Sequence, residues 1–218
     1  HAIALYNEQR NLLAELKGQW LAGSVNTATY RRLRQMALTQ APTAANQRLR
    51  RTLEAPAEAA EAPSAPPSAL RLLLLAELAA PAGLVRLVEA HRARVVAEDS
   101  DLDEQGLREP VPVDAETVEE LLAALAHAYL TKPPGPRMRD LDRRLAYLTH
   151  LVEERDAQAA VCAYGKFCDL HLAEFPSLKA HLEVLGIPVL LLELEDEAIS
   201  GQHRTRVEAF IEMRRESL

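Results

Sequence analysis

The feature that most constrains this fold is a regular alternation of short apolar runs with amphipathic segments after residue 70. The apolar runs have the length of strands, and the segments between them have the period of helices. We expect four strands, over Leu70–Ala76, Arg94–Ala97, Ala159–Tyr164 and Ile187–Glu193. We expect helices between and after them, over Ala82–His91, Ala115–Leu130, Arg139–Arg155, Asp169–Leu185 and Gln202–Arg215.

Strands that alternate with helices in this way form a parallel sheet with helices on both faces. The expected strands are almost continuously apolar, which is typical of strands buried on both sides. The sequence therefore predicts an α/β fold, a parallel four-stranded flavodoxin-like doubly wound sheet with strand order 2-1-3-4. In such sheets ligands bind beyond the carboxyl ends of the strands, at the point where the strand order reverses. For this order we expect the site between the first and third strands.

The first quarter of the chain has a different pattern, because its apolar residues recur at helical spacing. We expect a helical extension over 1–54, in which Asn26 or Thr27 caps a second helix and Thr43 caps a third. Residues 55–69 contain four prolines and no large apolar side chain, so we expect an Ala/Pro-rich linker there. The remaining residues, 70–218, are expected to form one α/β domain.

Composition argues against several kinds of partner. The net charge is −7, whereas nucleic-acid-binding domains usually have a basic surface, so we expect no nucleic-acid partner. The apolar runs, such as Leu72–Ala76, are far shorter than the roughly 18 residues that a membrane span needs, so we expect no membrane association. Two cysteines, Cys162 and Cys168, are too few for a disulfide-stapled secreted module. We expect both to be free thiols in a cytoplasmic protein.

Cys168 is the first candidate functional residue. It closes the loop that leaves the third expected strand, so we expect it at the crevice between the first and third strands. Asp169 is expected to cap the next helix, whose dipole would stabilise a thiolate, the form that acts as nucleophile or metal ligand. The alternative is a buried cysteine that behaves as a small apolar residue. Cys162, in the middle of a strand, is expected to be such a core residue.

A second candidate is the segment that leads from the fourth expected strand into the last helix. It offers a glycine for close backbone approach and amide and guanidinium donors, in the set Gly201, Gln202, Arg204, Thr205 and Arg206. Near a helix N-terminus such groups suit an anion or a cluster. A capped helix with exposed arginines explains the same residues equally well.

Other motifs are weaker. Asp99–Glu104 begins like a calcium loop, but its sixth position is Glu104 and its twelfth is Pro110, so we expect a solvated acidic loop. Cys168 and His171 approach metal-ligand spacing, but without two further ligands the signal is weak. The sequence has no phosphate-binding loop, no dinucleotide-binding glycine motif and no nucleophile elbow. Nucleotide binding and hydrolase chemistry therefore have no local support.

Three blocks in the last third of the chain, taken together, resemble one known family. They are Tyr164–Asp169, Pro176–Leu190 and Gly201–Phe210, and their order and spacing match the 2-hydroxyacyl-CoA dehydratase / benzoyl-CoA reductase family. A weaker likeness extends upstream, where Ala4–Leu13 resembles a family helix and Lys132–Met138 an inter-helix loop. The resemblance implies that the chain corresponds to the second, C-terminal domain of a subunit.

Members of that family are subunits of oxygen-sensitive enzymes that contain a [4Fe–4S] cluster. The resemblance implies ATP-activated electron transfer to a CoA thioester, for dehydration or for ring reduction. It also implies three partners, which are a homologous second subunit, an ATP-dependent activator protein and an acyl-CoA. By position, Cys168 corresponds to a cluster-ligating cysteine of the family, and Gly201–Arg206 to residues that line the same crevice.

The chain also departs from the family in the loops that surround this crevice. The loop after the second strand usually has a cysteine in the family, whereas here it is acidic, and Gly135 stands where many relatives have a cysteine. The loop after the first strand, commonly rich in serine and glycine, here runs from Glu77 to Pro81. One thiolate cannot hold a cubane that takes about four ligands.

Two hypotheses of different classes follow. In the first, the chain is the C-terminal part of a catalytic subunit, and the remaining cluster ligands lie in another domain. In the second, it is a degenerate, non-catalytic paralogue that keeps the fold and acts as the structural partner of an active subunit. A third alternative is an enzyme that uses the Cys168 thiolate alone, which predicts rapid alkylation at neutral pH.

Overall fold

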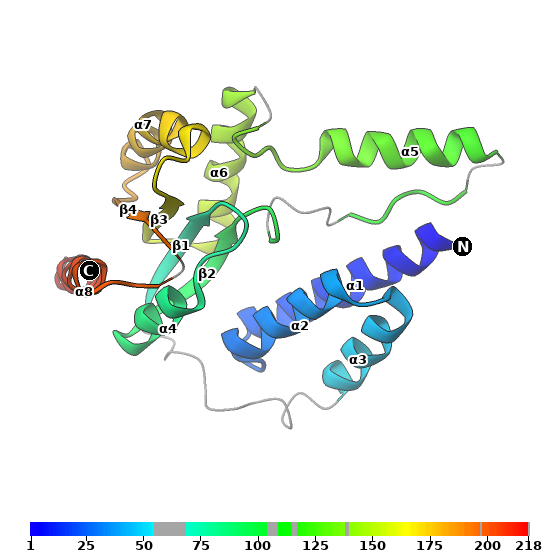
Figure 1. The fold of residues 1–218 in the computed structure, drawn as a ribbon, viewed down its shortest axis with the longest axis horizontal. Helices are drawn as coiled ribbons and strands as arrows, with labels where there is room; N and C mark the ends of the chain where they lie inside the picture. The colour runs from blue at the N-terminus through cyan, green and yellow to red at the C-terminus, as the bar shows by residue number, and fades with distance from the viewer. Residues whose placement is uncertain (55–68, 104–108, 115–116, 138–139, 197, 218) are drawn as a thin grey trace. The chain divides into compact units, whose positions relative to one another are not determined.

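The computed structural model describes residues 1–54, 69–103, 109–114, 117–137, 140–196 and 198–217. Their helices and strands fall into two compact units (Figure 1). The first, which we call the sheet unit, contains all four strands and the helices that pack on them. The second, the helical unit, contains the three N-terminal helices and one later helix, α5 (Val118–Thr131).

The sheet unit is built on four parallel strands. They are β1 Leu70–Ala76, β2 Ala93–Asp99, β3 Ala159–Gly165 and β4 Val189–Leu194. Their order is β2-β1-β3-β4 and every pairing is parallel, which confirms the predicted fold class and strand order. The register places Leu75 of β1 opposite Asp99 of β2 and Cys162 of β3. The strand order therefore reverses between β1 and β3, and their carboxyl ends form the edge where a ligand is expected.

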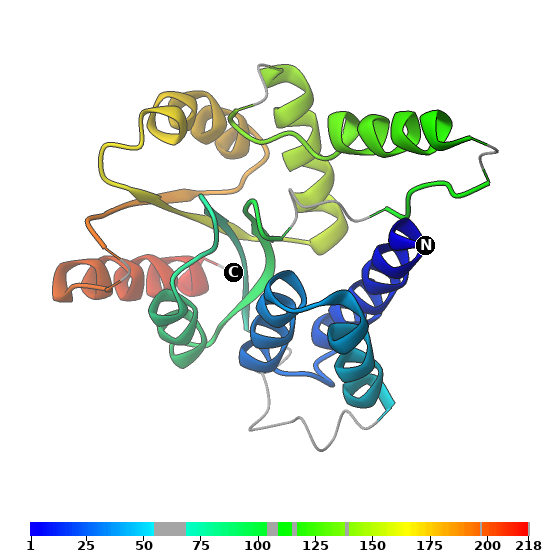
Figure 2. The ribbon, with the colours of Figure 1, turned by 45° about the vertical axis from the view of Figure 1, so that its right-hand side comes forward.

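Helices cover both faces of this sheet, as Figure 2 shows. α6 (Leu141–Arg155) and α7 (Asp169–Val184) cover one face, and α4 (Ala82–Ala90) and α8 (Gly201–Glu216) cover the other. The core under α6 and α7 is mainly aliphatic and includes Leu73, Leu75, Val96, Leu148, Leu151, Leu178 and Leu182. Successive side chains of a strand point to opposite faces, and β1 is buried along almost its whole length. Burial on both faces explains why the two central strands, β1 and β3, are almost continuously apolar.

The helical unit has a core of its own. α1 (Ala2–Leu21) packs on α2 (Thr27–Thr39) and α3 (Pro42–Glu54). Between α1 and α2, Trp20 stacks on Tyr30 with ring centroids 4.5 Å apart. The N-terminal helices are therefore held together by their own buried aromatic pair, which adds to the burial of apolar area.

The ends of these helices partly follow the sequence-based expectations. Asn26 caps α2, because its side chain accepts a hydrogen bond from the Thr29 N–H at 2.7 Å. The expectation that Thr43 caps α3 was wrong, because that helix already begins at Pro42. Proline is favoured in the first turn, where its missing N–H costs no helical hydrogen bond.

A side-chain bridge ties α1 to the segment before α5. The Asn7 amide donates to the Val111 carbonyl oxygen at 2.7 Å and accepts from the Val111 N–H at 2.8 Å. The boundaries expected from the sequence, 1–54, 55–69 and 70–218, stay a prediction, and almost all of the expected linker lies outside the described residues. None of the described helices is both long enough and apolar enough to cross a membrane.

Candidate functional site

The turn between β3 and α7 presents Cys168 at the carboxyl edge of the sheet. The Cys168 N–H donates to the Gly165 carbonyl oxygen at 3.0 Å, which closes the turn. Within it Phe167 has a φ of 69°, a left-handed conformation that few non-glycine residues adopt. The expectation that Asp169 caps the helix was wrong, because α7 already begins at Asp169 and Cys168 is its N-cap residue. The cysteine itself therefore stands at the helix N-terminus.

Two other potential ligand groups surround Cys168. A carboxylate oxygen of Glu77, the Sγ of Cys168 and a ring nitrogen of His171 all lie within 4.8 Å of one another. The Cys168 Sγ is 3.2 Å from the Nδ1 of His171. A separation of three residues places Cys168 and His171 on one face of the first turn of α7. Glu77 follows β1 directly. We call these three residues the edge cluster, because they meet where the strand order reverses.

Glu77 is fixed by the backbone around it. Its Oε1 accepts a hydrogen bond from the Gly165 N–H at 2.6 Å, and its carbonyl oxygen accepts from the Asp101 N–H at 3.0 Å. Gly165 allows this close approach, since a Cβ at that position would lie 2.8 Å from the Glu77 Oε1. The carboxylate is therefore held at the end of β3 before any ligand is considered.

His171 is the buried member of the edge cluster. Its side chain is 2 % exposed, and its ring packs on that of Tyr164 with centroids 4.7 Å apart. Burial lowers the pKa of His171, the charge of Glu77 opposes this, and the charges of Arg137 and Arg144 add to the lowering. The imidazole is therefore neutral at neutral pH, the form that accepts a proton or binds a metal.

The pKa of Cys168 does not follow the expectation from its place at a helix N-terminus. Burial raises this pKa, a hydrogen bond with the His171 backbone lowers it, and the hydrogen bond and charge of Glu77 raise it again. The net shift is upward, because desolvation and the neighbouring carboxylate both disfavour the thiolate. This upward shift of the pKa argues against the third alternative, an enzyme that uses the Cys168 thiolate alone.

Cys162 is a core residue, as expected. It is fully buried in β3, and burial raises its pKa to about 12. Both cysteines are free. Because the chain has no other cysteine, Cys168 is the one thiol that this edge can offer to a ligand.

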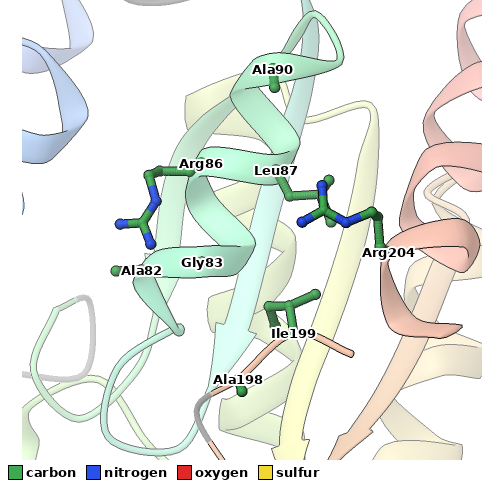
Figure 3. A pocket seen from close by; sticks show the side chains of 8 residues that line it. All are labelled: Ala82, Gly83, Arg86, Leu87, Ala90, Ala198, Ile199 and Arg204. Atoms are coloured by element: carbon green, nitrogen blue, oxygen red, sulfur yellow. The ribbon is translucent and has the colours of Figure 1, made fainter. Parts of the chain in front are cut away.

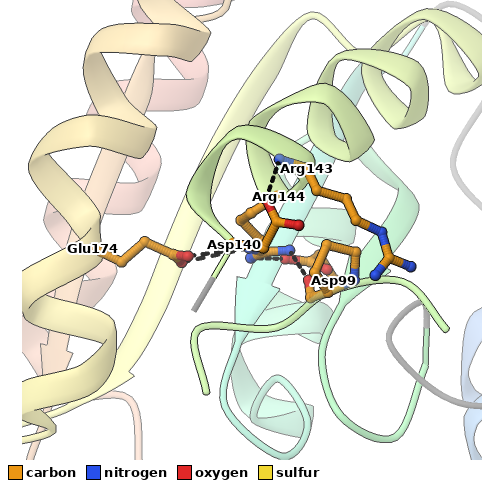
Figure 4. Close-up of polar contacts among 6 residues, drawn as sticks. Asp99, Asp140, Arg143, Arg144 and Glu174 are labelled. Atoms are coloured by element: carbon orange, nitrogen blue, oxygen red, sulfur yellow. Dashed lines mark hydrogen bonds and ion pairs between the residues drawn. The ribbon is translucent and has the colours of Figure 1, made fainter. Parts of the chain in front are cut away.

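Arg144, Asp99 and Glu174 form a buried ion triad. Arg144 of α6 is 1 % exposed and pairs with Asp99 at the end of β2 and with Glu174 of α7, 3.4 Å away (Figure 4). Its Nη1 also donates to the Pro134 carbonyl oxygen at 3.2 Å. Burial acts to lower the pKa of Arg144, but the charge and hydrogen bond of Asp99 raise it above its ordinary value. The triad thus fastens α6 and α7 to the end of β2 next to the site.

The expectation of a solvated acidic loop after β2 was wrong for three of its residues, whereas Asp101 and Leu102 are partly exposed. Asp99, Ser100 and Asp103 are all buried, whereas Glu104 lies outside the described residues. The charge of Asp99 is compensated by Arg144, a partner 45 residues away in the chain. A buried charge of this kind is stable only when it is paired.

The second predicted site lies in the first turns of α8 and is open to solvent. Its residues Gly201, Gln202, Arg204, Thr205 and Arg206 are all exposed. The Thr205 hydroxyl donates to the Gly201 carbonyl oxygen at 3.1 Å, and the Arg206 Nη2 donates to the Leu191 carbonyl oxygen at 2.8 Å. Ser200 caps the helix by accepting from the His203 N–H at 3.2 Å. These contacts are local to the β4–α8 connection.

Two different cavities divide this group. Arg204 extends from α8 toward α4 and lines a cavity of about 450 Å³ that Arg86 also borders (Figure 3). Gln202 and Arg206 line another of about 560 Å³, together with acidic side chains and Lys166 of the β3–α7 turn. The structure therefore brings Gln202 and Arg206 close to the turn that contains Cys168, and directs Arg204 elsewhere.

Sequence analysis missed Glu77 as a member of the edge cluster. We had noted only that its loop lacks the serine and glycine of the family. The available signal was its position, because it is the first residue after β1 at the predicted reversal of strand order. A polar residue at that position points into the same crevice as the end of β3.

A parallel sheet with a thiol, an imidazole and a carboxylate at the reversal of strand order defines a flavodoxin-like α/β protein with a polar site at its carboxyl edge. Residues 1–214 match the family described as 2-hydroxyglutaryl-CoA dehydratase, D-component. The chain belongs to this family, which confirms the resemblance found in the sequence. It is also 25 % identical over 130 residues to the (R)-phenyllactyl-CoA dehydratase beta subunit of Clostridium sporogenes. That match covers 59 % of this chain and about a third, 34 %, of the relative's length.

The residues of this chain do not by themselves fit the [4Fe–4S] cluster that the family resemblance implied. A cubane takes about four ligands, for the most part thiolates. Cys168 is the one cysteine thiol that can serve as a ligand at the carboxyl edge, since the other cysteine, Cys162, is enclosed in β3. The groups that surround Cys168 are a carboxylate and an imidazole. This donor set differs in kind from that of a cubane.

Proposed function

We propose that this chain is a subunit of a complex that acts on a 2-hydroxyacyl-CoA thioester, and that it binds a homologous second subunit. Its family membership over residues 1–214 supports the substrate class. The relative from Clostridium sporogenes is named as a beta subunit, which supports assembly with a different subunit. Both cysteines are free, and we propose the cytoplasm, where thiols stay reduced, as the place of the complex.

Within this complex we propose a structural role for the chain, as the partner of a subunit that holds the cluster. The observation that carries this proposal is the donor set at the reversal of strand order, with one thiol, one imidazole and one carboxylate. The fold that forms the crevice is complete in the described residues, with four parallel strands and helices on both faces. By the resemblance found in the sequence, the loops depart from the family pattern while the segments that build the fold keep it.

A second candidate function is favoured by the partial exposure of Cys168 at the carboxyl edge. With further ligands from outside this chain, its sulfur would be one ligand of a shared [4Fe–4S] cluster. The chain would then take part directly in ATP-activated electron transfer from an activator protein to the acyl-CoA, for dehydration or for ring reduction of the benzoyl-CoA reductase type. Gln202 and Arg206, beside the same turn, would help to bind the acyl-CoA.

Co-purification tests the proposed pairing. The full chain, tagged and expressed without oxygen together with a cluster-bearing subunit of the same family, is expected to elute with that subunit as one stable complex. A chain that elutes alone under every condition in which both proteins are folded would contradict the proposal.

Iron and sulfide analysis of the same complex separates the two roles. For the structural role, Cys168→Ala leaves the acid-labile sulfide of the complex unchanged. If Cys168 ligates the cluster, the same substitution is expected to remove the iron and the acid-labile sulfide of one cluster together. Cys162→Ala is the matched control, since it changes the other thiol, which is enclosed in the core.

A further inference from the structure

We infer that Glu77, Cys168 and His171 form a binding site for a single divalent cation of the zinc class. The inference concerns this chain alone and does not depend on the proposed assembly. It starts from the disagreement described above, in which a position that resembles a cluster ligand is surrounded by an imidazole and a carboxylate. The edge cluster supplies one sulfur, one nitrogen and one oxygen ligand.

The spacing of the three donors suits one small ion. Zinc binds sulfur, imidazole nitrogen and carboxylate oxygen at about 2.0–2.3 Å, so that ligand atoms around it lie roughly 3.5 Å apart. The Cys168 Sγ and the His171 Nδ1 are already 3.2 Å apart. The Glu77 oxygen lies within 4.8 Å of both, a gap that a small rotation of the side chain closes.

The surroundings hold all three donors in place. The Gly165 N–H donates to the Glu77 Oε1 at 2.6 Å, and outer hydrogen bonds of this kind orient metal-ligating carboxylates. The ring of His171 is buried and packs on that of Tyr164, which fixes the plane from which its nitrogen points. Cys168 is placed by the turn that its own N–H closes on Gly165. All three supports come from β3, and the donors come from the loop after β1 and from the start of α7.

The kind of donors selects the kind of ion. Calcium and magnesium take oxygen ligands, whereas a mixed thiolate, imidazole and carboxylate set suits zinc and its neighbours in the first transition series. Three protein ligands leave a fourth position of a tetrahedral ion open, as in sites where zinc activates a bound water or substrate. The neighbouring cation, Arg137, is paired with Asp101, so its charge is compensated near the site.

Metal titration of the purified full chain tests this inference. After treatment with a chelator, the chain is dialysed against zinc and its metal content is measured. We expect one equivalent of zinc in the natural chain. Glu77→Gln, Cys168→Ser and His171→Gln are each expected to weaken zinc binding by at least about 10–100-fold, the loss known for a disturbed metal-site residue. Cys162→Ala and His150→Gln, which change the same residue types away from the edge cluster, are expected to retain full binding.

Cobalt substitution provides a second measurement that does not depend on the stability of the buried His171. Cobalt bound to a thiolate gives a charge-transfer absorption, which we expect in the natural chain and not in Cys168→Ser. Cys168 is partly exposed, so this variant is expected to fold, and circular dichroism checks that it does. A natural chain that binds no zinc, or zinc binding that survives all three substitutions, would overturn the inference. Uptake of iron with sulfide at Cys168 by the chain alone would overturn it as well.

Discussion

The two stretches of the carboxyl edge that the sequence singled out differ in how their residues are brought together. At the β1–β3 reversal, the donors follow different strands and meet within 4.8 Å. At the start of α8, the five residues of one segment lie exposed, and three of them, Gln202, Arg204 and Arg206, line two separate cavities. The exposed residues at the start of α8 thus reach different cavities, whereas the end of β1 brings Glu77 to Cys168 and His171 at the start of α7. The geometry of a parallel sheet, more than a local motif, brings potential ligand side chains together at the reversal of strand order.

The strongest test of this contrast is the ion triad behind the edge cluster. Arg144→Met leaves Asp99 buried without its charge partner, so we expect a loss of about 3–5 kcal/mol in the free energy of unfolding. Urea unfolding followed by circular dichroism measures it. The same substitution at Arg204, exposed on α8, is expected to change the free energy by less than about 0.5 kcal/mol. Equal effects at both positions would show that the edge cluster has no special support.

A pair of glycine substitutions sharpens the comparison. Gly165→Ala places a Cβ 2.8 Å from the Glu77 Oε1. The flexible end of Glu77 then turns away and loses its hydrogen bond with the Gly165 N–H, so we expect a loss of about 1 kcal/mol in the free energy of unfolding. Gly201→Ala, at the start of α8, has nothing within 4 Å of the added atom and is expected to be neutral or slightly stabilising. Thermal unfolding of the two variants checks this. If the clash is the cause, Glu77→Ala combined with Gly165→Ala recovers part of the lost stability.

The α8 edge depends on its cap more than on its arginines. Ser200→Ala removes the side-chain acceptor for the His203 N–H, and we expect a loss of about 1 kcal/mol. Ser200→Asp keeps an acceptor at the same position and is expected to restore most of it. The unfolding midpoints of the natural chain and the two variants in urea give the comparison. An unchanged midpoint in Ser200→Ala would mean that tertiary packing alone stabilises the start of α8.

The smallest effect is expected at Arg206. Its Nη2 donates to the Leu191 carbonyl oxygen at 2.8 Å, but the side chain is exposed. Arg206→Gln is therefore expected to change the free energy of unfolding by less than about 0.5 kcal/mol. If Arg206 contributes to acyl-CoA binding, as in the second candidate function, the same variant binds acyl-CoA more weakly, which calorimetry measures on the assembled complex.

The outline of the fold could be predicted because it depends on local patterns. Continuous apolar runs and helical periodicity are properties of short segments, and parallel connectivity then allows few strand orders. The point of strand reversal followed from the order, and with it the placement of Cys168. The burial of Asp99 could not be predicted in this way, because its partner Arg144 is distant in the sequence. Glu77 was missed for the same reason, since its closest contacts are at the end of β3.

The hydrogen bond between Glu77 and Gly165 joins residues 88 positions apart in the chain. A ligand bound among Glu77, Cys168 and His171 would add a second link between the same two stretches, and one that can be taken away. An unfolded chain does not hold Glu77 near Cys168 and His171, so such a ligand favours the folded state by mass action, by about 2.7 kcal/mol at a hundred times its Kd. The melting temperature would then rise with ligand concentration, and removal of the ligand would reverse this stabilisation of the sheet unit.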